Sequence, residues 1–478
     1  MSEASSNTHN IFHSIWHRVT SHSRNLSGID KKYLYWRIRI LYSMYFGYVC
    51  YYFTRKSLVF AQPLLMQQLH ISKISLGLLG SSFYLTYGIS KFLSGVISDK
   101  SNPRYFMAFG LIITGVLNLI FGLTSSMWLF ALLWILNGFF QGWGWPPCAR
   151  LLTHWYAKSE RGMWWGIWNT SHNIGGALIP IIVALSATYW GWRYSMMIPG
   201  VAAILSGVLF LERLRDIPET LGLPDIETYT KQKKENICNT DPIQCEILEE
   251  KNKKDRTDKT SHTKSHHLPT KDILFKYVLN NPYLWTLSLI YILIYVIRTA
   301  INDWGNVYLH DHGFSLISAN SALSFFEIGG FFGSLVSGFA SDLLFKSKRT
   351  PVIILFCIGT LVALIIMSQL RSHIFIINSS CFFLIGFMIF GPHMLIGMAA
   401  AEHAHPDAAG TATGFLGLFG YIGAALSGYP LAALIQKSGW NTFFLSLIAC
   451  AIFAILILLA LSAKNRKQDN QNNPIKIS

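Results

Sequence analysis

The stretch WNTFFLSLIACAIFAILILLALSA, residues 440–463, contains no charged side chain. A helix needs about 20 apolar residues to cross the hydrocarbon core of a membrane, so this stretch is long enough to span one. In lipid, every backbone polar group has to be satisfied within the segment, and the alternation typical of a β-barrel strand is missing. The stretch therefore predicts a membrane-spanning α-helix.

Eleven similar stretches precede it in a chain of 478 residues that is 51% hydrophobic and 13% charged. We expect six spans near residues 38–62, 74–98, 105–124, 127–149, 163–187 and 193–212. Six more are expected near residues 283–309, 317–341, 351–370, 374–399, 409–434 and 440–463. The sequence thus predicts an all-α integral membrane protein with 12 transmembrane helices in two sets of six.

Polar segments separate and flank these two sets. Residues 1–34 form an N-terminal segment without the apolar core of a cleavable signal peptide, and residues 464–478 form a polar tail. Residues 214–280 form a linker that is too polar to cross a membrane or to pack into a core. An N-terminal half, residues 35–213, and a C-terminal half, residues 281–463, follow from these boundaries.

The two halves are related by an internal repeat. Matching residue types recur at offsets of 243 or 248 residues: Gly95 and Asp99 match Gly338 and Asp342, Gly175 and Ala177 match Gly423 and Ala425, and Gly191-Trp192 matches Gly439-Trp440. Chance matches in a glycine-rich chain are the alternative explanation. Duplicated six-helix halves are typical of secondary transporters whose substrate site lies near the membrane midplane, between the halves.

Lysine and arginine are distributed asymmetrically between the loops. One side, which includes the linker and both ends of the chain, carries most of them, whereas the other side carries Lys73, Arg193, Arg371 and Lys437. Because positive charge near a span is retained in the cytoplasm, we expect both termini to be cytoplasmic and the protein to lie in a bacterial inner membrane. This topology also explains the net charge of +15, so we expect no nucleic-acid partner.

Ionisable residues inside the predicted spans are few, and each is a functional hypothesis because burying a charge in a membrane is costly. They are Arg55, Lys56, Lys91, His172, Arg298, Asp303 and Glu327.

Arg55 and Arg298 lie 243 residues apart, the same offset as the repeated glycine and aspartate. A two-fold axis between the halves would place them face to face, where an anion would relieve their repulsion. A guanidinium fork suits phosphate because it can bind two phosphate oxygens at once. The alternatives are snorkelling to lipid headgroups or, for Arg298, neutralisation by Asp303. Lys56 points away from Arg55, so we expect it to lie at an interface or between helices.

Aromatic and polar side chains accompany these charges. Tyr48 and Tyr52 precede Arg55 on its own helical face, and Tyr295 stands likewise before Arg298, so we expect their hydroxyls near the substrate or packed as structural rings. Further polar residues, Asn169, His172 and Asn173, share one helical face. The histidine would respond to the charge state of phosphate or lock two helices together.

Acidic residues are expected to move with the halves. Asp303 and Glu327 either exchange salt-bridge partners as the halves rock or simply neutralise a neighbouring cation. Asp99 with Arg104, and Asp342 in the equivalent loop, stand at helix ends beside basic residues, and we expect them to act as latches. Asp99, Arg104, Asp342 and Glu327 are therefore the gating candidates, and Asp303 is counted among the substrate-binding residues.

Several stretches together resemble the organophosphate:phosphate antiporter family of the major facilitator superfamily. They share family motifs and run from about residue 33 to 463, outside the linker: residues 51–56, 90–92, 98–104, 141–148, 169–176, 298–304, Gly391-Pro392 and 410–421. The resemblance is strongest to the hexose-phosphate transporter and sensor branch, through residues 149–153 and 300–306. Glycerol-phosphate carriers have a tyrosine before the Gly-Pro pair, where this chain has Phe390.

The resemblance implies a major-facilitator-type fold and exchange of an organophosphate for inorganic phosphate by alternating access. It implies that Arg55 and Arg298 hold the phosphoryl group, that Lys91 and His172 tune its charge, and that Tyr421, in the 410–421 motif, belongs to the site. We therefore predict a hexose-6-phosphate:phosphate antiporter. The alternatives are a transporter-like sensor that signals to a membrane histidine kinase and a carrier of another organophosphate such as glycerol 3-phosphate. No clustered nucleophile or metal ligands appear, so we expect neither an enzyme nor a cofactor.

Overall fold

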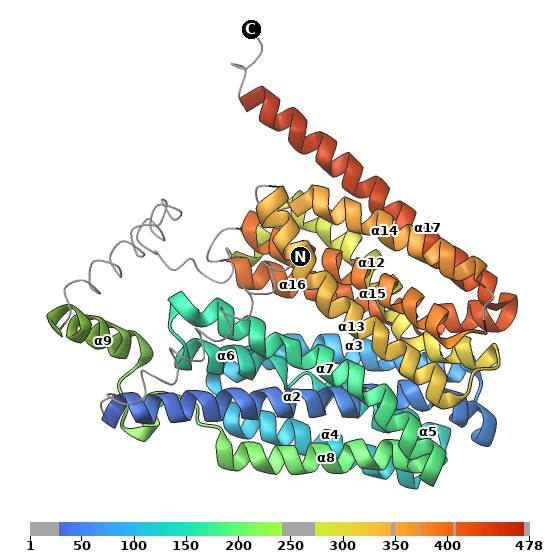
Figure 1. Ribbon diagram of the computed structural model, residues 1–478, viewed down its shortest axis with the longest axis horizontal. Helices are drawn as coiled ribbons and strands as arrows, with labels where there is room; N and C mark the ends of the chain where they lie inside the picture. Colours follow the sequence, from blue (N-terminus) through green and yellow to red (C-terminus); the bar gives the residue numbers. More distant parts are fainter. Residues whose placement is uncertain (1–27, 241–272, 346–348, 371–372, 405–407, 473–478) are drawn as a thin grey trace, which may run out of the picture.

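The structure is a computed structural model that describes residues 28–240, 273–345, 349–370, 373–404 and 408–472, and within these ranges every regular element is a helix (Figure 1). The N half comprises α2 (Gly28–Leu69), α3 (Lys73–Lys100), α4 (Pro103–Leu123), α5 (Met127–Gln141), α6 (Trp145–Trp155), α7 (Lys158–Trp190) and α8 (Trp192–Arg213). The C half comprises α12 (Pro282–Asp311), α13 (Leu316–Phe339), η4 (Ala340–Leu344), α14 (Arg349–Gln369), α15 (Phe375–His403), α16 (Ala409–Leu426) and α17 (Tyr429–Asn472). Between the halves lie η2 (Pro218–Leu221), α9 (Ile226–Thr240) and η3 (Ile273–Leu279). Residues 473–478 of the predicted tail and residues 241–272 of the predicted linker lie outside the described residues, as do residues 1–27.

Each of the 12 predicted spans has a helical counterpart. The fourth span is broken into α5 and α6 around Gly142 and Gly144, and the eleventh continues from α16 into the first residues of α17. Eight helical stretches of the described chain are long and apolar enough to cross a membrane, and one of them, Gly410–Ala463, contains two predicted spans. Helices α2 and α3 are more polar because they carry Arg55, Lys56 and Lys91 within their length.

The repeated Gly-Trp pair marks the same backbone feature in both halves. Gly191 has a φ of 94° between α7 and α8, and Gly439 has a φ of 78° where α17 changes direction. Side chains other than glycine rarely adopt this left-handed range of φ, so each position needs glycine. The repeat in the sequence therefore records equivalent turns between the fifth and sixth helix of each half.

Small residues allow the helices to approach closely. A Cβ added to Gly329 would lie 2.1 Å from the Phe383 carbonyl oxygen, and one added to Gly333 would lie 1.9 Å from that of Phe387. Gly386 approaches the Phe326 carbonyl in the same way. These contacts join α13 to α15, and small residues four apart are typical of helix packing in membranes.

The two halves meet at one end of the bundle. We call the end that carries α9 and the start of α2 the linker end, and the other the opposite end. Toward the opposite end, Ser81 Oγ donates to the Ala425 carbonyl at 2.6 Å and Asn320 Nδ2 donates to the Phe60 carbonyl at 3.0 Å. Toward the linker end, a Cβ added to Gly162 of α7 or Gly410 of α16 would meet no atom within 4 Å. Among the described residues, the halves therefore contact each other toward the opposite end, whereas these two glycines of the linker end make no close contact.

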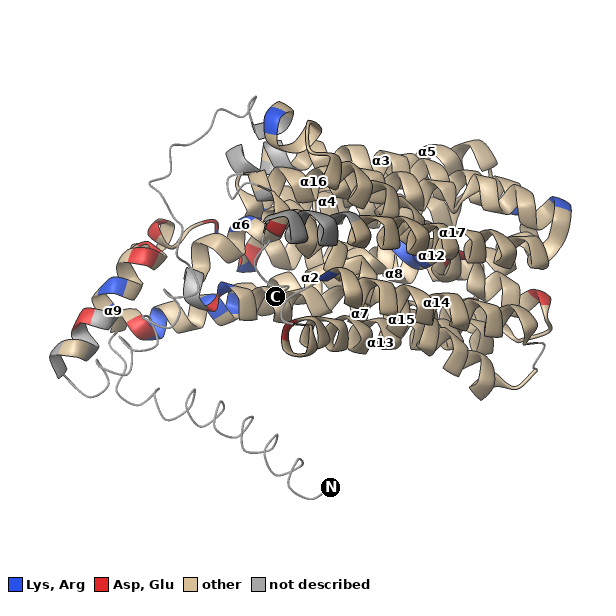
Figure 2. Cartoon of the chain, turned by 90° about the horizontal axis from the view of Figure 1, so that it is seen from above, with Lys and Arg blue, Asp and Glu red and all other residues tan. Residues whose placement is uncertain are grey.

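The first part of the linker packs against α2, so the expectation that the linker is too polar to pack is wrong there. Leu223, Ile226 and Tyr229 are buried, and the Tyr229 ring stacks on Tyr33 with 4.0 Å between centroids. The spacing of three residues places these apolar side chains together in an otherwise polar stretch. Figure 2 shows that charged residues gather at this end and on α9, whereas few occur within the helical bundle.

Candidate functional site

Equivalent helices frame the centre of each half. A Cβ added to Gly175 on α7 would lie 2.7 Å from Tyr52 Cβ, and one added to Gly423 on α16 would lie 3.0 Å from Tyr295 Cβ. Both glycines and both tyrosines belong to the internal repeat. Close packing at these glycines holds α2 against α7 and α12 against α16 in the same way, and it positions the arginine three residues after each tyrosine.

Arg55 and Arg298 line one small central cavity of about 30 Å³ at the boundary between the halves. The residues that share this cavity come from α2, α3, α12, α13 and α16: Tyr52, Arg55, Lys56, Tyr84, Tyr295, Arg298, Thr299, Asn302, Glu327, Tyr421 and Ala424. The structure therefore brings the two arginines together with three of the predicted tyrosines, Tyr52, Tyr295 and Tyr421.

The flat faces of the two guanidinium groups are covered by different rings. Arg55 Cζ lies 4.3 Å from the Tyr87 ring centroid, and Arg298 Cζ lies 4.4 Å from that of Phe390. The position equivalent to Tyr87 in the repeat is Gly330, and the Phe390 ring occupies the space beside it. Aromatic faces stabilise a cation without neutralising it, so the edges of both guanidinium groups keep their donors for an anion.

Neither arginine forms an ion pair with a carboxylate of the described residues. Their Nε atoms are buried and have no hydrogen-bond partner there. Arg298 Nη1 lies 3.4 Å from His393 Nε2, which requires that nitrogen to be unprotonated if it accepts the bond. A buried donor without a partner is costly, so this arrangement favours an incoming anion.

Asp303, predicted to contact substrate, instead binds two side chains of the N half. Lys56 Nζ lies 2.7 Å from Asp303 Oδ1, and the Tyr84 hydroxyl donates to Asp303 Oδ2 at 2.6 Å. Lys56 Nζ also donates to the Tyr84 hydroxyl at 3.1 Å. Both carboxylate oxygens of Asp303 are thus occupied, so it does not neutralise Arg298.

Glu327, predicted as a gating residue, lies at the cavity itself. It is 3% exposed, its Oε1 accepts from Asn302 Nδ2 at 3.2 Å, and its Oε2 has no partner among the described residues. Asn173 Nδ2 donates to the Glu327 carbonyl at 3.5 Å, a contact that joins α7 to α13. The buried carboxylate offsets part of the positive charge of the arginines.

The other predicted residues surround the cavity without lining it. Lys91 Nζ lies 5.0 Å from the Trp145 ring and 5.3 Å from the Tyr421 ring. The His172 ring lies 5.9 Å from that of Tyr52. Tyr48 is buried, with its ring 5.0 Å from Trp168, and the Asn169 side chain is exposed on α7. Tyr48 therefore packs, whereas Lys91 and His172 lie beside Tyr421 and Tyr52, two rings that line the cavity.

The predicted latches lie at the linker end. Arg349 pairs with Asp342, seven residues before it, and with Glu402 Oε1 at 2.8 Å, all within the C half. Arg104 Nε donates to the Leu211 carbonyl in the N half. Asp99 belongs to α3, but its side chain lies outside what the structure describes. The pairings observed for Arg104 and Arg349 thus remain within one half.

A latch that the sequence did not indicate joins the halves at the opposite end. Lys73 of α3 forms an ion pair with Asp311 of α12, and Trp440 Nε1 donates to Asp311 Oδ2 at 3.0 Å. Lys73 Nζ also lies 5.2 Å from the Trp440 ring. From the sequence, Lys73 was noted only as one of the few basic residues on the less positively charged side of the membrane.

His393 is a further site residue that the sequence analysis missed. It lies in the tenth predicted span, and an ionisable residue within a span is a signal in itself. Its ring stacks on that of Tyr291, with 5.6 Å between centroids and 19° between planes. With Arg298 beside it, His393 extends the central site toward α15.

Two cationic groups from opposite halves thus share a cavity that also contains hydroxyl and amide groups. This arrangement can bind an anion that touches both halves at once. Among the described residues, no group of three or more metal-ligating side chains is present. The fold and the site together define a two-half membrane transporter with a central anion site.

The comparisons with known proteins agree with this class. The Major Facilitator Superfamily matches residues 44–428, and the chain belongs to this family, which confirms the predicted fold class. A bacterial homologue of the lysosomal transporter Spinster, solved in an inward-facing and unoccupied conformation, shares the fold. Its TM-score is 0.66 at 16% identity, covering 90% of this chain and 96% of that one. The family consists of transporters rather than enzymes.

Curated relatives place the chain in the organophosphate:phosphate antiporter branch. The "Probable hexose phosphate transport protein" of Chlamydia trachomatis is 51% identical, covering 90% of this chain and 92% of the relative. The "Membrane sensor protein UhpC" of Escherichia coli is 47% identical, covering 92% and 95%. The "Glycerol-3-phosphate transporter" of Bacillus subtilis is more distant, at 36% identity, covering 90% and 94%.

Proposed function

We propose that the protein exchanges a hexose 6-phosphate for inorganic phosphate across a bacterial inner membrane. The observation that carries this proposal is that Arg55 and Arg298 reach one cavity from opposite halves without a carboxylate partner. A phosphoryl group offers several oxygens to two guanidinium forks, so one ligand can bind both. The names of the two most similar relatives reported above support a hexose phosphate as the organic substrate.

The phosphoryl group is bound between the halves. Lys91 and His172 interact electrostatically with its negative charge as it enters. Because positive charge is retained in the cytoplasm, the linker end is the cytoplasmic end, and both termini lie there. The site is then open to the cytoplasm and closed to the outside. Rocking of the halves about the bound anion would open the opposite end by breaking the Lys73–Asp311 latch.

Exchange follows from the charge of the empty site. Without an anion, the two arginines repel each other across the cavity, and the Glu327 carboxylate compensates only part of their positive charge. The halves therefore close over an occupied site more readily than over an empty one, and return requires a second anion. Inorganic phosphate, which carries the same phosphoryl oxygens, fits this return step.

A sensor is the second candidate function, favoured by the 47% identity to a membrane sensor protein. A sensor would use the same arginine pair to bind a hexose phosphate and would pass the resulting change in conformation to a membrane histidine kinase. Transport through the site would then be slow or absent.

Purified protein in liposomes separates these two functions. Uptake of labelled glucose 6-phosphate is measured into vesicles that contain inorganic phosphate and into vesicles that contain only chloride. We expect uptake in the first and little in the second, and the variant Arg298→Lys serves as a matched inactive control. Equal uptake into both kinds of vesicle would contradict exchange. Tight binding of glucose 6-phosphate without any uptake would instead establish a sensor.

A further inference from the structure

Three arginines at the linker end of the N half gather around one carboxylate. Arg39 Nη2 lies 2.9 Å from Glu212 Oε1, and Arg213 Nε lies 2.8 Å from Glu212 Oε2. Arg215 Nη1 donates to the Glu212 carbonyl oxygen at 2.9 Å. Arg39 Cζ and Arg215 Cζ also share the Trp36 ring, at 4.7 and 5.2 Å from its centroid. The three guanidinium groups therefore form one arginine cluster: Arg39, Arg213 and Arg215.

The arginine cluster carries more positive charge than its surroundings neutralise. Among the described residues, Glu212 is the one carboxylate within ion-pair distance of the cluster. Two further arginines of this end each have an acid of their own, since Arg37 pairs with Glu160 and Arg150 pairs with Asp216. Three guanidinium groups beside one carboxylate thus leave a surplus of positive charge.

This surplus leaves hydrogen-bond donors for an anion. Burial lowers the pKa of Arg215, and the charges of Arg104 and Arg39 lower it further, so the cations repel one another. Arg213 Nη2 and Arg215 Nη2 form no hydrogen bond with the part of the chain that the structure describes. Guanidinium donors suit phosphate oxygens, because both are arranged for paired, charged hydrogen bonds.

The arginine cluster lies where two lipid-facing helix surfaces end. Along α8, Val208 is exposed, and Glu212 follows four residues later on the same face. Along α2, Phe46 is exposed, and Tyr42 precedes it by four residues. The Tyr42 hydroxyl accepts a hydrogen bond from Arg213 Nη1 at 2.6 Å. Exposed apolar surfaces of membrane-spanning helices contact lipid, so the cluster is reached from the lipid side.

The depth of the arginine cluster matches that of lipid headgroups. Arg39 precedes Arg55 by 16 residues on α2, which is about 24 Å along a helix. The substrate site of a two-half transporter lies near the membrane midplane. A bilayer with its headgroups is about 40–45 Å thick, so its surface lies about 20–22 Å from the midplane. The cluster is therefore level with the lipid phosphates.

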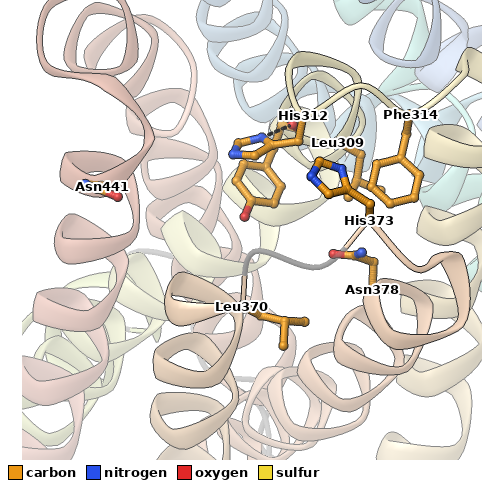
Figure 3. Close-up of a pocket in the computed structure, with 8 residues that line it drawn as sticks. Leu309, His312, Phe314, Leu370, His373, Asn378 and Asn441 are labelled. Carbon is orange, nitrogen blue, oxygen red and sulfur yellow. Dashed lines mark hydrogen bonds between the residues drawn. The ribbon is translucent and has the colours of Figure 1, made fainter.

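The opposite end shows no comparable cluster among the described residues. Arg193 there donates to backbone carbonyls at the end of α4, and Lys73 pairs with Asp311. Figure 3 shows amide and imidazole groups, including those of Asn378 and His312, around a pocket at that end. The arginine cluster thus distinguishes the membrane leaflet at the linker end.

We propose that the arginine cluster binds the headgroup of an anionic phospholipid in the leaflet at the linker end. The lipid phosphate accepts from the donors that Arg213 and Arg215 leave unused, and the acyl chains lie along the exposed faces of α2 and α8. Trp36 and Tyr42 hold the arginines in place, as aromatic residues do at membrane interfaces. Basic pockets between helices favour anionic headgroups, because a zwitterionic headgroup brings a cation of its own.

Lipid retention by the full chain in detergent tests this site. The protein is equilibrated with equal amounts of phosphatidylglycerol and phosphatidylcholine, free lipid is removed by gel filtration, and bound lipids are counted by mass spectrometry. We expect the wild-type protein to retain about tenfold more phosphatidylglycerol than phosphatidylcholine. Arg213→Gln/Arg215→Gln should lose most of this preference. Glu212→Gln, which removes the opposing carboxylate, should raise it severalfold, a gain that misfolding cannot produce.

Lys31→Gln/Lys32→Gln is the matched control, because it removes the same charge from exposed residues about 10 Å farther along α2. It should keep the wild-type preference, and excess inorganic phosphate in the buffer should not displace phosphatidylglycerol. Displacement would identify free phosphate as the ligand and overturn the proposal. So would equal retention of both lipids by the wild-type protein, an unchanged preference in Arg213→Gln/Arg215→Gln or Glu212→Gln, or its loss in the control. Failure of phosphate exchange does not bear on this result, because the cluster does not line the central cavity.

Discussion

Lys56 Nζ lies 2.7 Å from Asp303 Oδ1, so the basic residue next to Arg55 pairs with the acid five residues after Arg298. Both residues are buried, and the pair crosses the boundary between the halves. Lys56 thus neutralises Asp303, the aspartate that the sequence analysis considered as a partner of Arg298. Arg298 therefore remains available to bind substrate.

Breaking this pair is expected to destabilise the fold. Asp303→Asn leaves Lys56 buried without a countercharge, and removing one partner of a buried pair costs about 3–5 kcal/mol. Thermal unfolding of the solubilised protein should show a clearly lower midpoint. The double variant Lys56→Met/Asp303→Leu should recover most of the loss. An Asp303→Asn variant as stable as wild type would refute the role of the pair.

The latch at the opposite end is expected to control access from that end. Lys73→Ala or Asp311→Ala removes the ion pair between α3 and α12 and should favour opening there. Labelling of a cysteine placed at Ser81 by an impermeant maleimide should accelerate several-fold. The charge swap Lys73→Asp/Asp311→Lys should restore slow labelling, and unchanged labelling in both single variants would contradict the prediction.

Close approach of α3 and the α16–α17 corner is expected to need glycine. A Cβ added to Gly77 would lie 2.8 Å from the Gly428 carbonyl oxygen and 2.5 Å from Ala432 Cβ. Gly77→Leu should wedge the halves apart at the opposite end and lower the exchange rate at least tenfold. Gly80→Leu, on the same helix with no atom within 4 Å of an added Cβ, is the control and should exchange normally. Equal exchange rates in Gly77→Leu and Gly80→Leu would show that exchange does not depend on this close contact.

The Phe390 ring over Arg298 is expected to influence the choice of organophosphate. Phe390→Tyr adds a hydroxyl beside the guanidinium and gives the residue type that the family resemblance assigns to glycerol-phosphate carriers at this position. Competition assays should show a several-fold rise in affinity for glycerol 3-phosphate relative to glucose 6-phosphate. An unchanged ratio would mean that the ring affects only the arginine.

The helical organisation was predictable because length and hydropathy decide which stretches span a membrane. The span predicted at residues 283–309 coincides with α12 to within two residues at each end, whereas the last span, predicted to end at residue 463, continues in α17 to Asn472. The break between α5 and α6 was not predicted because glycines in apolar stretches are as often packed inside a helix as they are at its ends.

The site was predictable in part, through the repeat that relates Arg55 to Arg298. Pairing across the halves was not, since sequence spacing does not show which helices face each other: Asp303 was assigned to Arg298 or to substrate, and it pairs with Lys56. The latch of Lys73 and Asp311 joins the first residue of α3 to the last residue of α12, and nothing in the sequence relates these two helix ends. The docking of Tyr229 on Tyr33 was hidden by the polarity of the surrounding linker.

The central claim is that one phosphoryl group is held by Arg55 and Arg298 together. A double-mutant cycle on phosphate binding, measured calorimetrically with Arg55→Lys, Arg298→Lys and the double variant, tests it directly. Each single change should weaken binding about 10- to 100-fold through loss of charged hydrogen bonds, and Lys56→Met should weaken it less. The double variant should lose less than the sum, because each arginine depends on the other to hold the same anion. Near-normal affinity in both single variants, or strictly additive losses, would contradict the claim.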